Sequence, residues 1–401
     1  MTELNKLFAA TKQAFDLPEG VIYLDGNSLG PMTHASRTRL IDEMDNQWSQ
    51  KLIRGWNESG WYQLAQTVGD KIAALIGAPK GTVTAADNTS INVHKVLSAA
   101  LAMNPGRKVI LSDSGNFPTD LYAAQGVIAG LNDGYELKVV TPEQVFDAID
   151  ESVAVVMITQ VDYCTGRLHD MASITERARA NGVKTIWDLC HSAGAMAIQL
   201  DALQVDFAVG CGYKYFNGGP GAPAFLYVRE EHINNIQPVL TGWMGHASPF
   251  SFEQQYTPMQ GIGRMRVGTP SILGLASLDA ALDVFCSVSM EQIRQRSVEL
   301  SEVFMDEVAK CCPQLELASP TDAGLRGSQV SYRFPQGYAV VQALIDHGVV
   351  GDFRMPDIIR FGITPLYLNR ADIVKAAQII GDVMANQLWD CDKFKAKQAV
   401  T

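Results

Sequence analysis

The stretch VDFAVGCGYKYFNGGPG, residues 205–221, joins a buried apolar run to a glycine-rich turn. The first half is typical of a strand inside a sheet, and the second half is a turn that lets a ligand approach the backbone. Lys214 stands between the two halves, flanked by Tyr213 and Tyr215. Because burying an ammonium group is costly, we expect this lysine either to serve a site or to extend its amine to the surface.

The sequence around this stretch predicts a sheet covered by helices. Short Val/Ile-rich runs bounded by turn residues predict strands at 107–113, 153–161, 183–189, 205–212 and 222–228. Segments 121–131 and 170–182 predict helices, the second closed by Gly182. Strands that alternate with helices in this way predict an α/β fold with a doubly wound, mainly parallel sheet sandwiched by helices.

The C-terminal part has a different pattern. Residues 287–312 predict one long helix, and short strands and helices follow it at 328–335, 339–348, 358–364 and 371–389. This order favours a smaller α+β domain. We therefore predict a large domain over residues 55–285 and a small domain built from residues 1–54 and 286–401.

Composition favours a soluble enzyme of the cytoplasm. The 401 residues carry a net charge of −11, so nucleic acid and anionic lipid would be repelled and a small-molecule partner is expected. The first 20 residues lack the features of a secretory signal, and no apolar stretch approaches the ~18 residues of a membrane helix. The seven cysteines are scattered, odd in number and without CxxC spacing, as free thiols of the cytoplasm would be.

Two charged residues follow successive predicted strands. Asp188 ends one strand and Lys214 follows the next, 26 residues later. Ligands of open α/β sheets bind at the carboxyl ends of strands, and this pair matches the needs of pyridoxal phosphate (PLP). The lysine amine would form an imine with the aldehyde, and the carboxylate would keep the ring nitrogen protonated. His191 lies three residues past Asp188, in reach of the ring. Alternatively, Lys214 reaches the surface and Asp188 caps a helix.

A phosphate group needs a helix N-terminus, where free N–H groups favour an anion. Thr89 and Ser90 open such a helix and offer two hydroxyls, although an ordinary helix cap would look the same. In the segment 111–126, Phe117 could stack on a flat ring, and Asp120 could bind its polar edge or cap the next helix. Thr159 lies near another strand end, where its hydroxyl could meet a ring oxygen.

Arg360 alternates with apolar neighbours in a predicted strand, a pattern typical either of a bidentate carboxylate clamp or of an edge-strand ion pair. Trp243 and Thr269 lie in glycine-rich loops and could complete a phosphate cup or be structural. Motifs of other chemistries are missing from the sequence: there is no GxGxxG opening a βαβ unit, no P-loop, no His/Cys cluster with zinc spacing and no GxSxG elbow.

Six segments together resemble kynureninase, a family of fold-type I PLP enzymes. They are YLDGNSLGP (23–31), NFPTD (116–120), WDLCHSAGA (187–195), GCGYKYFNGGPGAPAFLYV (210–228), GWMGH (242–246) and RVGTPSI (266–272). The resemblance spans about residues 20 to 370, and the lysine segment is its most specific part.

The resemblance implies a role for each candidate residue. Lys214 would carry the cofactor, Asp188 would pair with the ring nitrogen, and Tyr213 would be the candidate acid/base for the ketone or serve only the phosphate. The other cofactor-binding residues would be Thr89, Ser90, Phe117, Asp120, Thr159, His191, Trp243 and Thr269. Arg360 would hold the substrate carboxylate, and Trp56 or Trp61 would flank the aryl group. The family is a homodimer with shared sites, so Trp243 and Thr269 could come from the neighbouring chain.

The family reaction is hydrolysis of L-kynurenine to anthranilate and L-alanine by Cβ–Cγ cleavage, a step of tryptophan catabolism. Whether 3-hydroxykynurenine is also accepted stays open. A fold-type I aminotransferase or a cysteine desulfurase is the alternative within the same fold. A non-catalytic PLP- or nucleotide-binding regulator is the alternative from another class, although no basic DNA-binding module is present.

Overall fold

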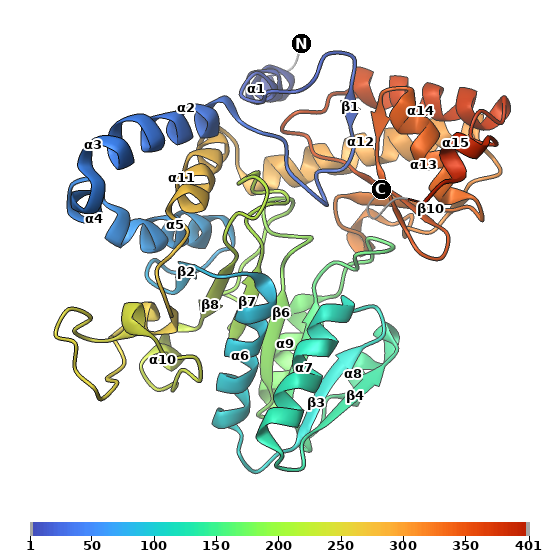
Figure 1. Cartoon of the computed structure of the whole chain (residues 1–401). Helices are drawn as coiled ribbons and strands as arrows, with labels where there is room; N and C mark the ends of the chain where they lie inside the picture. Colours follow the sequence, from blue (N-terminus) through green and yellow to red (C-terminus); the bar gives the residue numbers. More distant parts are fainter. Residues whose placement is uncertain (1–2, 398–401) are drawn as a thin grey trace.

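The structure, a computed structural model, describes residues 3–397, and its main element is a seven-stranded sheet (Figure 1). The strand order is β2-β8-β7-β6-β5-β3-β4. Only β8 runs against the others, because it pairs antiparallel with both β7 and β2. The predicted mainly parallel sheet is therefore confirmed. The strands are β2 (Val83–Ala85), β3 (Val109–Asp113), β4 (Glu136–Val140), β5 (Val153–Thr159), β6 (Lys184–Asp188), β7 (Phe207–Gly210) and β8 (Phe225–Val228).

Helices bury both faces of this sheet. Along β5, Val155 and Met157 belong to one apolar cluster, while Val156 and Ile158 belong to the other. Successive side chains of a strand point to opposite faces, so a strand that is apolar at every position must be covered twice. The helices α6 (Thr89–Met103) and α7 (Pro118–Leu131) supply the first cover, and α9 (Met171–Ala180) contributes to the second.

The five strands and two helices predicted for this region are all present. Their bounds differ from the predicted ones by a few residues, and Asn181 rather than Gly182 is the C-cap of α9. Gly182 follows it with a φ of +67°, a conformation that favours glycine. The strands β2 and β4 were not predicted.

The C-terminal part forms a second, four-stranded antiparallel sheet with the order β12-β13-β10-β9. Its strands are β9 (Glu316–Leu317), β10 (Gln329–Arg333), β12 (Asp352–Arg354) and β13 (Ile358–Gly362), and its helices are α12 (Met290–Cys311), α13 (Gly337–Asp346) and α14 (Arg370–Ala385). The N-terminal strand β1 (Ile22–Tyr23) pairs with β11 (Val349–Val350), so the start of the chain returns to this part. The division into residues 55–285 against 1–54 and 286–401 stays a prediction.

An N-terminal arm packs on α11 (Ile272–Ala281). In α2 (His34–Asp42), the Ser36 hydroxyl donates to the Ser277 carbonyl at 3.0 Å, and Arg39 pairs with Asp279 at 3.2 Å. The arm continues through a π-helical turn (Glu43–Trp48), α3 (Ser49–Lys51), a 3₁₀ turn (Leu52–Arg54) and α4 (Gly55–Glu58) into α5 (Trp61–Leu75). The remaining α-helices are α1 (Glu3–Lys12), α8 (Val145–Ala148), α10 (Glu230–Ile233) and α15 (Asp392–Lys395), and short 3₁₀ turns lie at 142–144, 243–245, 262–265, 282–287 and 323–325.

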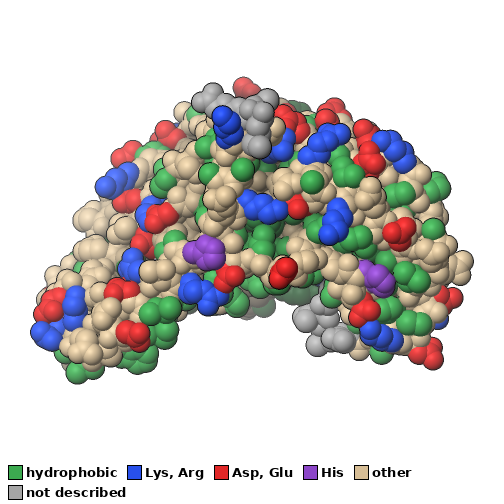
Figure 2. Space-filling model, turned by 90° about the horizontal axis from the view of Figure 1, so that it is seen from above, with side chains coloured by type: hydrophobic (Ala, Val, Ile, Leu, Met, Phe, Trp, Pro, Cys, Tyr) green, Lys and Arg blue, Asp and Glu red, His purple; other side chains and the backbone are tan. Residues whose placement is uncertain are grey.

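The surface seen from above carries Lys/Arg and Asp/Glu side chains interspersed rather than gathered in one basic patch (Figure 2). Within residues 3–397, no single helix is long and apolar enough to cross a membrane. One pair bent by 81°, Ile272–Ser287 with Met290–Cys311, meets the length and composition test only when taken together. The same residues hold no group of three or more His, Cys, Asp or Glu side chains that could bind a metal ion.

Candidate active site

Lys214 lies four residues past the end of β7, at the edge of the sheet where the parallel strands end. Its Nζ is 3.0 Å from Nε2 of His191 and 5.8 Å from the centre of the Tyr213 ring. His191 is buried, and Lys214 is half-buried. The amine therefore contacts other candidate residues instead of extending alone into solvent.

Asp188 and Asp120 are two buried carboxyl groups that lie close enough for each to affect the ionisation of its neighbour. Asp188 ends β6, and its Oδ1 accepts the Cys190 N–H at 2.7 Å. Burial and then the neighbouring Asp188 raise the pKa of Asp120 well above its usual range, and the Lys214 ammonium partly opposes this shift. Asp120 therefore tends to keep its proton beside Asp188, and the two groups together offer acceptor oxygens to a cationic ligand.

The helix-cap alternatives for these two carboxyl groups are wrong. The residues after Asp188 form turns and no helix. The N-cap of α7 is Phe117, which makes no side-chain cap hydrogen bond, and Oδ2 of Asp120 has no hydrogen-bond partner among the described residues. Neither carboxyl group is therefore used to end or begin a helix.

His191 is neutral in this setting. Burial, and next the Lys214 ammonium, lower the pKa of its imidazole well below the usual range. Its Nε2 faces Lys214, while its Nδ1 is buried with no hydrogen-bond partner in the part of the chain that is described. A neutral imidazole at this position can stack on a ring or bond its edge without competing with Lys214 for a proton.

The other predicted groups of this edge come from α6, β5 and the loop before α7. Asn88, not Thr89 or Ser90, caps α6, since its side chain accepts the Ile91 N–H at 3.0 Å. The Thr89 hydroxyl is instead 3.6 Å from Sγ of Cys190. The predicted alternative of an ordinary Ser/Thr cap is therefore wrong.

Thr159 and Phe117 complete this edge. The Thr159 hydroxyl, at the end of β5, donates to the Val161 carbonyl at 3.1 Å. The Phe117 ring is 41 % exposed and meets the Tyr163 ring edge-on, with 5.0 Å between centres. Phe117 immediately precedes the first turn of α7, which carries Asp120, and its exposed aromatic face is free to cover a bound ring.

Trp56 and Trp243 contact aromatic side chains that do not belong to the group around Lys214. Trp56 is in α4, edge-on to Trp61 at 6.1 Å, and Figure 1 shows α4 far from the ends of β6 and β7. Trp61 is buried, and its Nε1 donates to Glu43 at 2.8 Å. Trp243 is 38 % exposed and lines a cavity of about 360 Å³ in the loop segment 241–256.

Thr269 lines a cavity of about 240 Å³ together with Arg266 and Asp87. Asp87 immediately precedes the N-cap of α6, so this cavity borders the helix start that carries Thr89. Arg266 is buried, and its Nε and Nη1 have no hydrogen-bond partner among residues 3–397. A buried cation without a partner attracts an anion. In this segment the sequence predicted only Thr269 as a site residue, because no sequence pattern indicates that Arg266 is buried.

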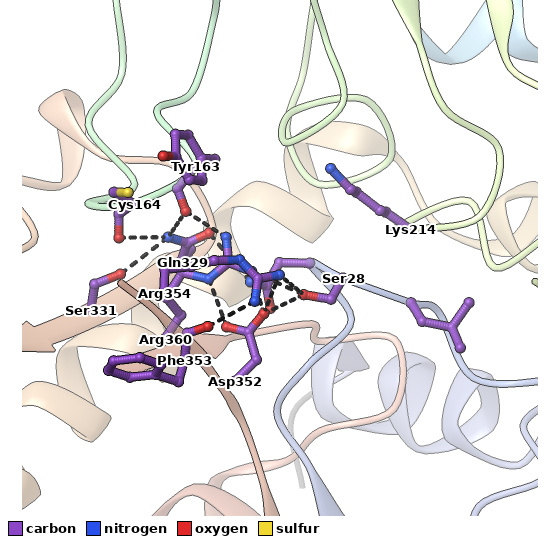
Figure 3. Close-up of polar contacts among 12 residues, drawn as sticks. Ser28, Tyr163, Cys164, Lys214, Gln329, Ser331, Asp352, Phe353, Arg354 and Arg360 are labelled. Carbon is purple, nitrogen blue, oxygen red and sulfur yellow. Dashed lines mark hydrogen bonds and ion pairs between the residues drawn. The ribbon is translucent and has the colours of Figure 1, made fainter. Parts of the chain in front are cut away.

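Arg360 lies in β13, which is flanked by β12 and β10 and is not an edge strand. Its guanidinium is held by Asp352, the residue opposite it in β12, with Nε 2.6 Å from Oδ1. Nη1 donates to the Tyr163 carbonyl at 2.6 Å, and Nη2 donates to the Ser28 hydroxyl at 3.0 Å and to Asp352. Figure 3 shows this group together with Lys214, which is drawn apart from it on another segment of the chain.

The sequence reasoning missed Ser28, Asp352, Arg354 and Tyr163. A signal existed for Asp352 and Arg354, because GDFRMPDIIRF (351–361) can be read as a hairpin in which Asp352 opposes Arg360. Ser28 stands in YLDGNSLGP, far from Arg360 in sequence. No local pattern brings these two segments together.

The residues present fit pyridoxal phosphate. The carboxyl pair with its orphaned Asp120 Oδ2 suits a cationic ring N–H, and the orphaned Nδ1 of His191 suits a ring substituent. The buried Arg266, whose Nε and Nη1 lack partners, and the start of α6 suit a phosphate. Lys214 supplies an amine in contact with the same group of residues.

The carboxyl group of Asp25, near Arg360, should make the stability of the fold depend on pH. Burial, and next Asp352, raise its pKa to about 7, and its Oδ1 has no hydrogen-bond partner among the described residues. An unfolded aspartate releases its proton near pH ~4. From there to about pH 7 the folded protein keeps a proton that the unfolded chain has lost, so the free energy of unfolding falls as the pH rises.

Asp25→Asn removes this ionisation. We expect it to raise the free energy of unfolding by about 1–3 kcal/mol at pH 8 relative to the parent, with a smaller gain at pH 5. Thermal unfolding of both proteins from pH 5 to 8 measures the difference. A difference that does not grow with pH would contradict the assignment.

Comparison with known proteins supports one family over nearly the whole chain. The sequence profile of the Kynureninase C-terminal domain matches residues 293–380, and that of the DegT/DnrJ/EryC1/StrS aminotransferase family matches residues 40–200. The chain is 44 % identical to the kynureninase of Pseudomonas fluorescens over 400 residues, which cover 98 % of this chain and 96 % of that protein. It is 47 % identical to the kynureninase of Deinococcus radiodurans over 384 residues, which cover 94 % and 93 %.

The fold resembles that of a cysteine desulfurase. The apo structure of the desulfurase from Thermococcus onnurineus NA1 matches with a TM-score of 0.79, covering 94 % of this chain and 98 % of that chain. The two sequences are only 17 % identical, so this likeness shows a shared fold and nothing more.

Proposed function

The chain belongs to the kynureninase family, and from that premise we propose that it hydrolyses L-kynurenine to anthranilate and L-alanine as a step of tryptophan catabolism. It is a PLP-dependent hydrolase of a carbon–carbon bond with a fold of type I. The aminotransferase and desulfurase alternatives receive less support, because the relatives with 44–47 % identity over nearly the whole chain are kynureninases.

Lys214 is the residue that we propose to hold the cofactor and to move the substrate's α-proton. When bound, the cofactor supplies an electron sink for the carbon atoms next to the amine. The lysine amine lies beside the neutral His191, and when it is not bonded to the cofactor it would take a proton from the substrate Cα. The neutral imidazole does not donate a competing proton.

Asp188 keeps the ring nitrogen cationic in this proposal. Its carboxylate is fixed by the Cys190 N–H and backed by Asp120, whose raised pKa keeps a proton within the pair. A preorganised negative charge in a buried site stabilises a cation more strongly than water does. Phe117, Thr159 and His191 then surround the ring.

Tyr213 is our candidate for the acid that acts on the substrate ketone. Burial raises the pKa of its phenol, so the hydroxyl stays protonated at neutral pH and can donate a proton to a ketone oxygen. Service to the phosphate alone is the alternative role. Water adds to the ketone, and Cβ–Cγ cleavage then releases anthranilate before alanine.

A homodimer with shared sites completes the proposal. Thr89 and Ser90 would bind the phosphate from one chain. Thr269 would join them either from the same chain, where its cavity borders the start of α6, or together with the exposed Trp243 from the neighbouring chain. Trp56 would approach the substrate aryl group. The support is the exposure of Trp243 and Thr269 and the separation of α4 from the ends of β6 and β7 (Figure 1). Light scattering should give about twice the 43.6 kDa of one chain; a mass of one chain would contradict it.

We also propose a cytoplasmic location. All seven cysteines are free, and Cys190 and Cys211 are buried beside the candidate site. Free thiols are typical of a reducing compartment. Recovery of the native enzyme in the periplasmic or secreted fraction would contradict the proposal.

The observation that carries the function is the gathering of Lys214, His191, Asp188 and Asp120 at one edge of the sheet. Purified protein with PLP is expected to release fluorescent anthranilate from L-kynurenine, with one L-alanine per turnover. Release of a keto acid would indicate an aminotransferase, and sulfur release from cysteine would indicate a desulfurase. The ratio of kcat/KM for 3-hydroxykynurenine and kynurenine decides the substrate preference.

A further inference from the structure

Arg360 has few donors left for a substrate. A guanidinium carries five N–H groups. Nε–H and one Nη2–H go to Asp352, the second Nη2–H goes to Ser28, and one Nη1–H goes to the Tyr163 carbonyl. One N–H remains, whereas a bidentate grip on a carboxylate uses two parallel N–H groups. Arg360 in this geometry cannot form that grip alone.

A second arginine shares the same carboxylate. Nη2 of Arg354 lies 2.8 Å from Oδ2 of Asp352, and its Nη1 donates to the Phe353 carbonyl at 2.8 Å. The Arg354 side chain is 35 % exposed, against 2 % for Arg360. Arg354 is therefore the more accessible of the two cations.

Strand geometry places the three charged groups on one side of the C-terminal sheet. Asp352 and Arg354 are two residues apart in β12, so their side chains leave the same face. Arg360 stands directly opposite Asp352 in β13. Figure 3 shows both arginines around Asp352, with Lys214 across from them. The paired backbones of β12 and β13 thus fix the positions of the three charged groups relative to one another.

The charges of this group are unbalanced. Two buried or half-buried guanidinium groups pair with the carboxylate of Asp352, and Asp25 nearby is only partly ionised near pH 7 because its pKa is raised, so positive charge exceeds negative charge. Two cations that share one anion repel each other in a site of low dielectric constant. One further carboxylate would neutralise the group.

We propose that Arg354 and Arg360 bind the α-carboxylate of the amino-acid substrate together, and that Asp352 is the positioning residue that holds both. This proposal rests on the proposed function, because it assigns the substrate end that lies toward Lys214. Arg360 contributes its remaining Nη1–H, and Arg354 contributes the accessible charge. The contrasting interpretation is a purely structural network that ties Ser28 and Tyr163 to the C-terminal sheet.

Arg354→Met separates these interpretations. The product L-alanine carries the carboxylate, and ethylamine is the same molecule without it. Both can be titrated against the holoenzyme by the absorption of the bound cofactor. We expect the variant to bind L-alanine roughly 10- to 100-fold more weakly than the parent. Its affinity for ethylamine should change by less than about twofold. The KM for kynurenine should rise by a similar factor, with a smaller change in kcat.

Arg333→Met is the matched control. Arg333 ends β10 of the same sheet and pairs with Asp357 at 3.0 Å, so its removal also breaks an Arg–Asp pair. We expect unchanged affinities for both ligands. Asp352→Asn should also lower the affinity for L-alanine. In the double variant with Arg354→Met, the loss of affinity should be smaller than the product of the two single losses.

Two results would overturn the proposal. In the first, Arg354→Met binds L-alanine like the parent enzyme. In the second, L-alanine and ethylamine weaken equally, as loss of a structural network would require. If Asp352→Asn fails to fold, the half-exposed Arg354 still decides the outcome. The titrations need only bound cofactor, so they remain informative even if the parent enzyme releases no anthranilate, a result that would defeat the proposed function instead.

Discussion

Lys214→Ala is expected to abolish the visible absorption band of the lysine-bound cofactor and to lower anthranilate release by about 10³-fold or more. The reason is that one amine performs two tasks. It holds the cofactor aldehyde, and it lies 3.0 Å from a neutral His191, free to move the substrate's α-proton. Absorption spectra and turnover with saturating cofactor measure the two losses separately.

Lys71→Ala is the control for this prediction. Lys71 is also partly buried and is paired with carboxylates, Asp279 and Asp283. It belongs to α5, which packs against β2 and α11. We expect this variant to keep the absorption band and the turnover number. Wild-type turnover in Lys214→Ala would remove the basis of the proposed function.

Asp188→Ala is expected to retain part of the bound cofactor while kcat falls about 10²- to 10³-fold. Removing the carboxylate leaves the ring nitrogen without its negative partner, so the ring accepts electrons less readily. The orphaned Asp120, whose pKa is already raised by burial, cannot replace a full charge. Asp188→Asn keeps the shape of the side chain and should lose a similar factor, because the charge is what matters.

Asp206→Asn provides the comparison for Asp188. Asp206 is equally buried but lies just before β7, at the other edge of the sheet, where it pairs with Lys184 and His232. This variant should lower the thermal stability and leave kcat per folded enzyme unchanged. A near-normal rate in both Asp188 variants would show that the ring nitrogen needs no carboxylate in this enzyme.

Most of the large sheet was predictable because its strands are buried on both faces. Each of the five predicted runs contains a short stretch of apolar residues that is buried in the sheet, which is the pattern of a strand covered by helices on both faces. The strand β4 was missed because it lies at the edge and its side chains are largely exposed, and β2 was missed because it has only three residues. The antiparallel direction of β8 depends on the strands with which it pairs, and the sequence of one strand does not reveal its partners.

The candidate site likewise contains some residues that the sequence predicted and others that only the structure revealed. Strand ends carry Asp188, Thr159 and Lys214, so the edge rule for open sheets located them from the sequence. Asp352 and Ser28 meet Arg360 only through a hairpin and a return of the N-terminal segment. Arg266 became a candidate only because the structure shows that it is buried and that its Nε and Nη1 lack partners.

By itself, the sequence determined the fold class, the strand-end residues and the family resemblance, since these depend on patterns of a few consecutive residues. Only the tertiary structure decided that Asp120 faces Asp188, that His191 touches Lys214, and that Arg360 shares its counter-ion with Arg354. The physical reason is that a charge interacts through space with whatever folding brings near it. Burial and partners, which set protonation and donor use, are properties of the packed molecule.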